Sequence, residues 1–220
     1  MRNNGKKSTN GRKRLRHGFF LFLSLATVSC AHQYIRQEPL PKERIDQRQA
    51  IVEYAKSLLG TKDLRAVNKN FRNDCTGYLL GVYHTLGYTV KVEPGSGKKS
   101  LSELLYLTLK KAGRIYRERI PDIGDAAFFE STLPNTWGHV SHAGLVEQVE
   151  SDGTVVILHY GSGRVGRIRM NLEHPYRRTD NEGKVINDYV RRDDYGTAKS
   201  EFLAGALFTA FGDLPGYCEK

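Results

Sequence analysis

A single cysteine lies where a helix is expected to begin. In the segment Asn73-Asp74-Cys75-Thr76-Gly77, Asp74 is a favourable N-cap residue, so Cys75 is predicted in the first helical turn. The unpaired backbone N–H groups and the dipole of a helix N-terminus favour a thiolate, so we expect a lowered pKa for Cys75. The small neighbour Thr76 leaves room for a substrate. The pattern indicates a nucleophilic cysteine, and the competing interpretation is a buried structural cysteine.

A nucleophilic cysteine needs a base, and two histidines fall on predicted strands. His142 begins one β-rich segment and His159 ends the next. With a loop over residues 150–153, the numbers of facing residues sum to about 303, so His142 faces roughly residues 159–161. Both imidazoles then lie at the same end of one hairpin, whereas a tight two-residue turn at Asp152-Gly153 would place residue 163 opposite His142. His142 is the predicted general base and His159 the predicted group that orients it.

The order of predicted elements indicates the fold class. Three amphipathic helices are expected first, at 49–59, 75–86 and 100–109, ending at Gly60, Gly87 and Gly113. Short β-rich segments follow at 126–130, 142–150, 154–160 and 165–171, with a further strand at 189–192 and a buried element of undetermined type at 201–211. Helices followed by a strand meander define an α+β class, with the helices packed on an antiparallel sheet.

The first thirty residues have the organisation of an export signal. Basic residues precede an apolar segment of about a dozen residues, which is too short to span ~30 Å of hydrocarbon. The segment ends Thr27-Val28-Ser29-Cys30, which resembles a bacterial lipobox with Cys30 as the acylated residue. We therefore expect a signal peptide over 1–29, a lipidated tether over 30–48 and a catalytic domain over 49–220. By analogy with enteric lipoproteins, in which Asp after the acylated cysteine is an inner-membrane retention signal, Ala31 favours an outer-membrane lipoprotein that faces the periplasm.

The charge distribution argues against a nucleic-acid partner. The 220 residues carry 34 Lys+Arg against 24 Asp+Glu, a formal net charge of +10. Seven of the basic residues lie in the first 17 positions, so the rest of the chain carries 27 basic against 24 acidic residues. A nucleic-acid binder normally concentrates basic charge in its folded part. The three cysteines, at 30, 75 and 218, are too few and too scattered for a disulfide framework.

Several motifs together resemble the NlpC family of papain-like cell-wall cysteine peptidases. Asp74-Cys75-Thr76-Gly77 is similar to the family's Asp-Cys-Ser-Gly motif. The segment 123–129 is similar to its Pro-Gly-Asp-Leu-Val-Phe-Phe strand, and 142–146 to its His-Val-Gly-Ile-Tyr strand. His159 corresponds in place to the family's third polar residue. The matches occur in the family's order over about residues 50–175. The Tyr-x-Trp-Gly-Gly segment frequent in the family has no counterpart here, because residues 64–71 contain no tyrosine.

The resemblance implies a circularly permuted papain-like fold and hydrolysis of peptide bonds in peptidoglycan stem peptides, with no cofactor. Cys75 would be the nucleophile, with His142 and His159 completing the site. Asp74, Thr76, Trp137 and His139 are candidate lining residues of the substrate cleft. Partners would be wall peptides and, through acylated Cys30, a lipid bilayer.

Three alternatives remain open at this point. The chain could be a catalytically silent lipoprotein that binds wall peptides, or a papain-like amidase or acyltransferase with another substrate. The spacing of His139 and His142, together with His159 and Cys75, could also ligate zinc. We favour the nucleophile over the metal site because a helix-terminal cysteine suits it better.

Overall fold

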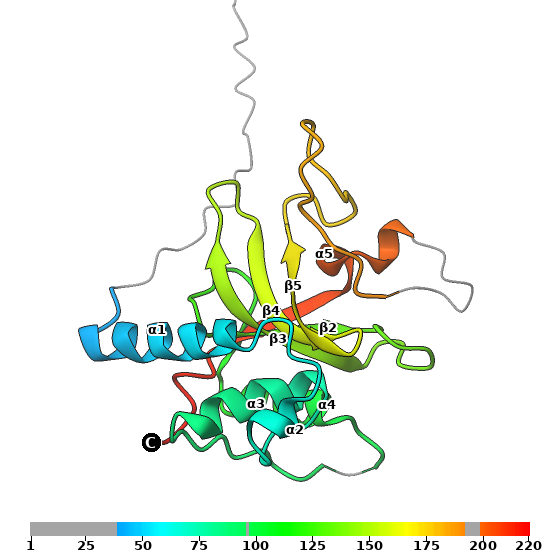
Figure 1. Cartoon of the computed structure of the whole chain (residues 1–220). Coiled ribbons are helices and arrows are strands. Elements are labelled where there is room, and N and C mark those ends of the chain that lie inside the picture. The colour runs from blue at the N-terminus through cyan, green and yellow to red at the C-terminus, as the bar shows by residue number, and fades with distance from the viewer. Residues whose placement is uncertain (1–38, 96, 192–198) are drawn as a thin grey trace, which may run out of the picture. The chain divides into compact units, whose positions relative to one another are not determined.

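A six-stranded antiparallel sheet forms the centre of the molecule in this computed structural model, which describes residues 39–95, 97–191 and 199–220 (Figure 1). The helices are α1 (Lys42–Ser57), α2 (Leu64–Val67), α3 (Cys75–Thr85), α4 (Leu101–Lys111) and α5 (Ala204–Leu207), with a short 3₁₀ turn at Ser200–Phe202. The strands are β1 (Ile115–Tyr116), β2 (Ala126–Glu130), β3 (Val140–Val149), β4 (Val155–Gly161), β5 (Arg164–Met170) and β6 (Phe208–Gly212).

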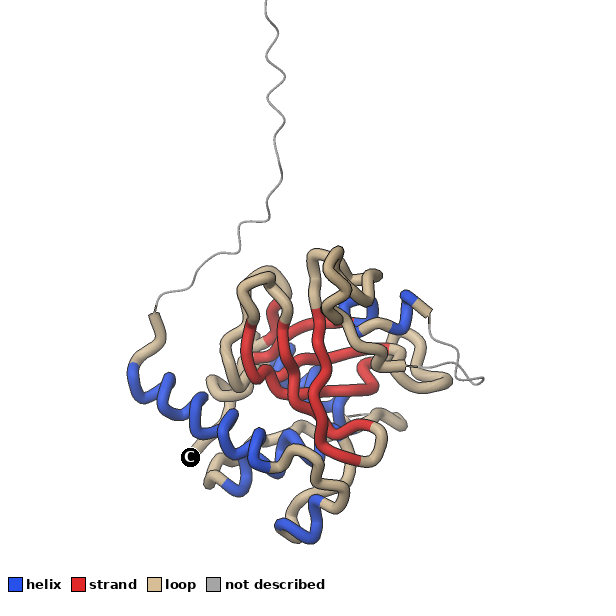
Figure 2. Tube along the Cα trace, turned by 45° about the horizontal axis from the view of Figure 1, so that its top comes forward, coloured by secondary structure: helices blue, strands red, loops and turns tan. Residues whose placement is uncertain are grey.

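The helices and the sheet enclose the larger of two apolar clusters. Side chains from α1, α3 and α4 pack on alternate residues of β2, β3 and β4, among them Phe128, Ala143 and Leu145. On the other face of the same strands, Phe129 and Ile157 join side chains of β5, β6 and α5 in the second cluster. Figures 1 and 2 show α1, α3 and α4 gathered on one side of the strands. The mixed helix-and-antiparallel-sheet architecture agrees with the predicted class.

The helix signals in the sequence were informative. The side chain of Ser100 accepts a hydrogen bond from the backbone N–H of Glu103 at 3.1 Å, which caps α4 at the predicted start of that helix. Gly60, Gly87 and Gly113 follow the ends of α1, α3 and α4 with positive φ angles, a conformation that glycine adopts without steric cost. These glycines therefore end the three helices where the sequence predicted.

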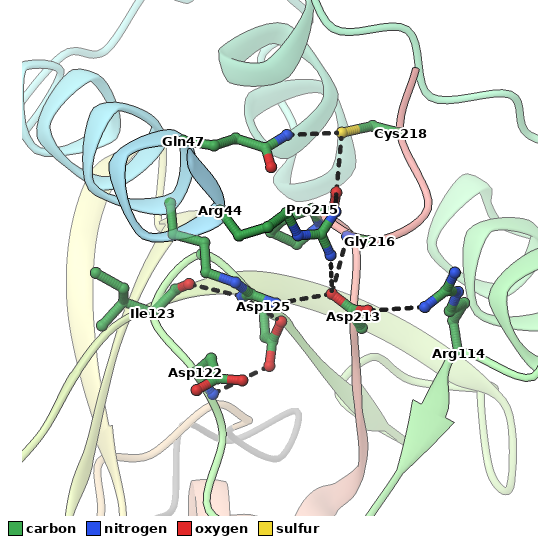
Figure 3. A network of polar contacts seen from close by, with 12 residues as sticks. Arg44, Gln47, Arg114, Asp122, Ile123, Asp125, Asp213, Pro215, Gly216 and Cys218 are labelled. Atoms are coloured by element: carbon green, nitrogen blue, oxygen red, sulfur yellow. Dashed lines mark hydrogen bonds and ion pairs between the residues drawn. The ribbon is translucent and has the colours of Figure 1, made fainter. Parts of the chain in front are cut away.

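The first helix begins earlier than predicted. Residues 42–48, assigned to the tether because they show no apolar period, form the first turns of α1. Arg48 explains the difference: it is 2% exposed and pairs with Asp125 and Asp213, each at 2.7 Å. Figure 3 shows the two carboxylates within a larger polar network. Since this anchoring is ionic, the hydrophobic pattern did not reveal it, and the folded part extends N-terminally of residue 49.

The C-terminal part of the chain completes the sheet. The sheet order is β1-β6-β2-β3-β4-β5, so β6 inserts between β1 and β2. The segment 201–211, predicted as one element, divides into a 3₁₀ turn, α5 and the first part of β6. The segment predicted as a strand at 189–192 contributes an isolated bridge between Tyr189 and Leu203, and residue 192 lies outside the described residues. No helix among the described residues is long and apolar enough to cross a bilayer.

Candidate active site

Cys75 opens α3, as the sequence predicted. Asp74 is the N-cap, and its Oδ1 accepts a hydrogen bond from the backbone N–H of Gly77 at 2.7 Å. Arg72 forms an ion pair with the same carboxylate at 2.8 Å. The first N–H groups of a helix have no intrahelical partner. The backbone N–H of Cys75 is therefore suitably placed to stabilise a negatively charged oxygen beside the sulfur.

A close crossing of the chain holds this helix start in place. An added Cβ at Gly77 would lie 2.8 Å from the carbonyl oxygen of Arg72, which is too near for any side chain. One turn later, the ring of buried Phe71 lies directly over Gly81. The two glycines thus allow the segment that leads into Cys75 to pack against α3.

The surroundings of the sulfur contradict the expected lowering of its pKa. Cys75 is half-buried, and its Sγ lies 3.8 Å from the Oγ1 of Thr76. Burial raises the pKa of the Cys75 thiol above its ordinary value, and the charge of Asp74 acts in the same direction. Hydrogen bonds to the backbone of Ala143 and to Thr76 oppose the rise without overcoming it. Desolvation outweighs the helix N-terminus here, so the ground state is a neutral thiol.

The two predicted histidines are directly paired. Nε2 of His142 on β3 lies 2.8 Å from Nδ1 of His159 on β4, and the two rings meet edge to face with centroids 5.0 Å apart. The ring of Phe129 on β2 packs near His142, with centroids 6.0 Å apart. The hairpin register places both histidines at one end, because Leu145 faces Leu158 and Val146 faces Ile157. The predicted sum of about 303 is confirmed by these pairs.

Both imidazoles are neutral at physiological pH. Burial, with a smaller contribution from the neighbouring His159, lowers the pKa of His142 to about 3. Burial lowers the pKa of His159 to about 4. A neutral imidazole can accept a proton, so both rings are in the protonation state that a general base and its orienting group require.

The pairing dictates the tautomers that a reactive site would use. Since Nε2 of His142 is committed to His159, Nδ1 is the nitrogen that remains to accept a proton. Nε2 must then carry the hydrogen and donate it to Nδ1 of His159. Cys75 lies next to this strand, at the backbone of Ala143. Within the described residues, neither imidazole forms a hydrogen bond with its sulfur.

The candidate cleft residues take different positions. Thr76 is buried beside Cys75 and Asp74 caps α3, so both are direct neighbours of Cys75. His139 is 62% exposed and its Nδ1 lies 3.1 Å from Glu103, away from the other histidines. It therefore does not join the proposed zinc set, and no group of three or more metal-binding side chains occurs in the described ranges. Trp137 is 64% exposed and stacks on Arg191, with 4.4 Å between guanidinium carbon and ring centroid.

Cys75, His142 and His159 do not line either of two cavities found elsewhere in the molecule. One, of about 350 Å³, lies at the turn end of the same hairpin, between Val149, Asp152 and Phe211. The other lies between α1 and the C-terminal residues, beside the free thiol of Cys218. The predicted acylation site, Cys30, lies outside the described residues.

Three features around these residues are not evident from the residue types in the sequence. The backbone of Ala143 lies against Cys75, the ring of Phe129 packs on His142, and Gly161 lies beside His159. The segment Gly161-Ser162-Gly163 is typical of a turn, so its composition does not by itself indicate a role for Gly161 beside His159. Its position two residues after a histidine was the signal that could have revealed it.

Comparisons with known proteins give little further information. No protein-family model matches the chain, and no curated protein matches it. Among solved structures, the crystal structure of an N-acetylmuramoyl-L-alanine amidase from Staphylococcus aureus is similar, with 21% identity and a TM-score of 0.33. The match covers 46% of this chain and 27% of that one. A likeness that covers so little of the two chains defines neither the fold nor the chemistry of the site.

Proposed function

We propose that the chain is a cysteine hydrolase that cleaves amide bonds in peptidoglycan stem peptides. The observation that carries the proposal is the hydrogen-bonded pair of His142 and His159. Cys75, the first residue of α3, contacts the backbone of Ala143, the residue that follows His142. The ordered motifs that resemble the NlpC family point to the cell-wall substrate, and with it to a circularly permuted papain-like fold. Cys75, His142 and His159 take the roles of nucleophile, general base and orienting group.

The proposed reaction begins at the neutral thiol. His142 Nδ1 takes the proton of Cys75 as the sulfur attacks the carbonyl carbon of the amide, and the carbonyl oxygen becomes an oxyanion. The backbone N–H of Cys75 faces this oxygen, and a well-aimed donor contributes roughly 3 kcal/mol. The C–N bond then breaks, and the amine leaves with the proton from His142. Water, deprotonated by the same imidazole, attacks the thioester, which releases a carboxylic acid and restores the thiol. The sequence of steps needs no cofactor.

A second candidate function is supported by one observation. The Cys75 sulfur contacts the hydroxyl of Thr76 and makes no hydrogen bond with an imidazole in the described part of the chain. A catalytically silent protein that binds wall peptides at the same residues is compatible with this arrangement. The two functions differ in whether a covalent bond of the wall is broken.

Digestion of purified sacculi distinguishes them. We expect the wild-type protein to release soluble muropeptides, and the Cys75→Ser variant to release none while it still sediments with the wall. The masses of the fragments identify the bond that is cut, and so separate a stem endopeptidase from an amidase. Equal sedimentation of both proteins without released fragments would support the silent binder. Absence of both binding and release would refute both functions and favour an amidase or acyltransferase with another substrate.

We also propose that the chain is anchored in the cell envelope through acylated Cys30, as an outer-membrane lipoprotein that faces the periplasm. The basic segment, the apolar segment and the small residues before Cys30 support this proposal. Acyl chains contribute about 0.8 kcal/mol for each buried CH₂ group, so several chains hold firmly. We expect Cys30→Ser to abolish processing or membrane association. A processed, membrane-bound Cys30→Ser protein would contradict the proposal.

A further inference from the structure

Both strands that carry the histidine pair repeat one short pattern. β3 contains His142-Ala143-Gly144, and β4 ends with His159-Tyr160-Gly161. Alternate residues of a strand point to the same face, so each histidine shares its face with the glycine two positions later. The pattern therefore places two imidazoles, and two glycine positions that carry no side chain, on one face of the hairpin.

The register arranges these positions as a cross-strand square. Leu145 faces Leu158 and Val146 faces Ile157. Continuing this register places Gly161 opposite His142, and Gly144 opposite His159. The histidines thus occupy one diagonal of the square and the glycines the other. Diagonal neighbours are about 7–8 Å apart, farther than directly opposed residues, so the imidazoles must lean over the glycine positions to meet.

The space around His159 shows how the ring reaches its partner. An added Cβ at Gly161 would lie 2.8 Å from Nδ1 and 3.3 Å from Nε2 of His159. The same Nδ1 lies 2.8 Å from Nε2 of His142. The imidazole therefore occupies the volume that any side chain at 161 would need, and it does so in the orientation that forms the hydrogen bond. On the opposite strand, an added Cβ at Gly144 would lie 3.3 Å from the Cβ of His159.

We propose that Gly161 is a positioning residue of the site: its missing side chain lets the His159 imidazole lie along β4 and hold His142 in the orientation of a general base. The inference rests on the proposed function for its effect on catalysis. The geometric part, that residue 161 determines the His142–His159 hydrogen bond, stands independently of any activity.

The decisive variant is Gly161→Ala, with Gly166→Ala as the matched control. Gly166 faces His159 from β5, but an added Cβ there meets nothing within 4 Å. A misplacement of about 1 Å can cost about 100-fold in rate, so we expect kcat on a wall peptide to fall about 10- to 100-fold in Gly161→Ala with little change in KM. Gly166→Ala should keep the wild-type kcat. Equal kcat values in Gly161→Ala and wild type would overturn the inference.

A measurement without substrate separates this inference from the proposed function. In the wild-type protein, imidazole ¹⁵N and ¹H spectra should show His142 as the Nε2–H tautomer with a slowly exchanging, hydrogen-bonded proton. We expect Gly161→Ala to lose that signal and Gly166→Ala to keep it. Loss of the signal in a chain that proves inactive on walls would support the positioning role and refute the hydrolase. Retention of the signal in Gly161→Ala would refute the positioning role alone.

The double variant Gly161→Ala/His159→Ala tests whether residue 161 acts through the ring. Removing the imidazole removes the clash, so Gly161→Ala should have no further effect on kcat in the His159→Ala background. If Gly161→Ala alone does not fold, the double variant should fold, because the obstructing ring is absent. An unchanged loss of activity in both backgrounds, or failure of both variants to fold, would show that residue 161 acts by another route.

Discussion

His142→Ala is expected to reduce turnover of a wall peptide by about 10²–10⁴-fold, the usual contribution of a general base. Turnover falls because the Cys75 thiol is neutral and depends on His142 to remove its proton. Burial raises the pKa of Cys75, so little thiolate is present at neutral pH and an acceptor must remove the proton during attack. The same imidazole returns the proton to the leaving amine. Removing it abolishes both transfers, and the measurement is kcat of the purified variant on one defined peptide.

Two further variants calibrate this result. His139→Ala is the matched control, because His139 is exposed, lies three residues earlier and pairs with Glu103. It should retain nearly the wild-type kcat. The kcat of His159→Asn should lie between those of His139→Ala and His142→Ala, since an amide oxygen can still accept a hydrogen bond from Nε2 of His142. If His139→Ala is inactive while His142→Ala turns over, the base has been assigned to the wrong residue.

The pH dependence of kcat/KM should reveal the buried base. The imidazole accepts a proton only when neutral, so activity is lost as the pH falls through the pKa of His142. Burial lowers this pKa to about 3, against 6.5 for an ordinary histidine. We therefore expect kcat/KM at pH 5 to be close to that at pH 7, with the acid limb below about pH 4. A half-maximal rate near pH 6.5 in the wild-type protein would contradict the buried, neutral imidazole.

The elements that carry local signals could be predicted from the sequence, and so could their register. Asp74 before Cys75 located the start of α3. The turn after Val149 gave the pairing of β3 and β4 to within one residue, and a bulge between Val146 and Gln148 sets the register beyond it. These features depend on residues close in the chain, such as caps and turns. That is why the sequence alone indicates that His142 and His159 lie at the same end of the hairpin.

Features that depend on burial or on distant partners were not predictable. The pKa of Cys75 was expected to fall because a helix N-terminus is visible in sequence, whereas desolvation depends on packing around the folded site. β6 joins the sheet between strands far from it in the chain, and the apolar segment 201–211 carries no period that selects one element type. The role of Gly161 likewise emerges only when both strands of the hairpin are in register.

The start of α1 also depends on partners that are distant in the sequence. We expect loss of these partners to lower the free energy of unfolding strongly. Arg48 joins α1 to Asp125, which precedes β2, and to Asp213, which follows β6. Asp125 is fully buried and also accepts hydrogen bonds from the hydroxyl of Tyr116 and from the backbone N–H of Asp122. The network thus connects three segments that are far apart in sequence (Figure 3).

Arg48→Met is expected to destabilise the domain by about 3–5 kcal/mol, because it leaves a buried carboxylate without its cation. For a chain of this size the melting temperature should fall by roughly 6–20 °C. Arg114→Met is the matched control: Arg114 pairs with the same Asp213 at 3.1 Å, but its side chain is 45% exposed. Exposed ion pairs contribute about 0–1 kcal/mol, so this variant should melt close to wild type. Thermal unfolding of the three proteins provides the comparison.

The pH dependence of the Arg48→Met effect distinguishes an unpaired charge from lost packing. Burial already raises the pKa of Asp125 from 3.8 to about 6 in the presence of Arg48, and loss of the cation should raise it further. The folded variant then binds a proton that the unfolded chain, with its lower pKa, does not bind, so the variant loses stability as the pH rises. The difference in free energy of unfolding between Arg48→Met and wild type should therefore be larger at pH 8 than at pH 5. Adding Asp125→Asn should recover much of the loss at pH 8, because the amide oxygen still accepts from Tyr116 without a charge. A pH-independent difference that Asp125→Asn does not reduce would assign the role of Arg48 to packing instead.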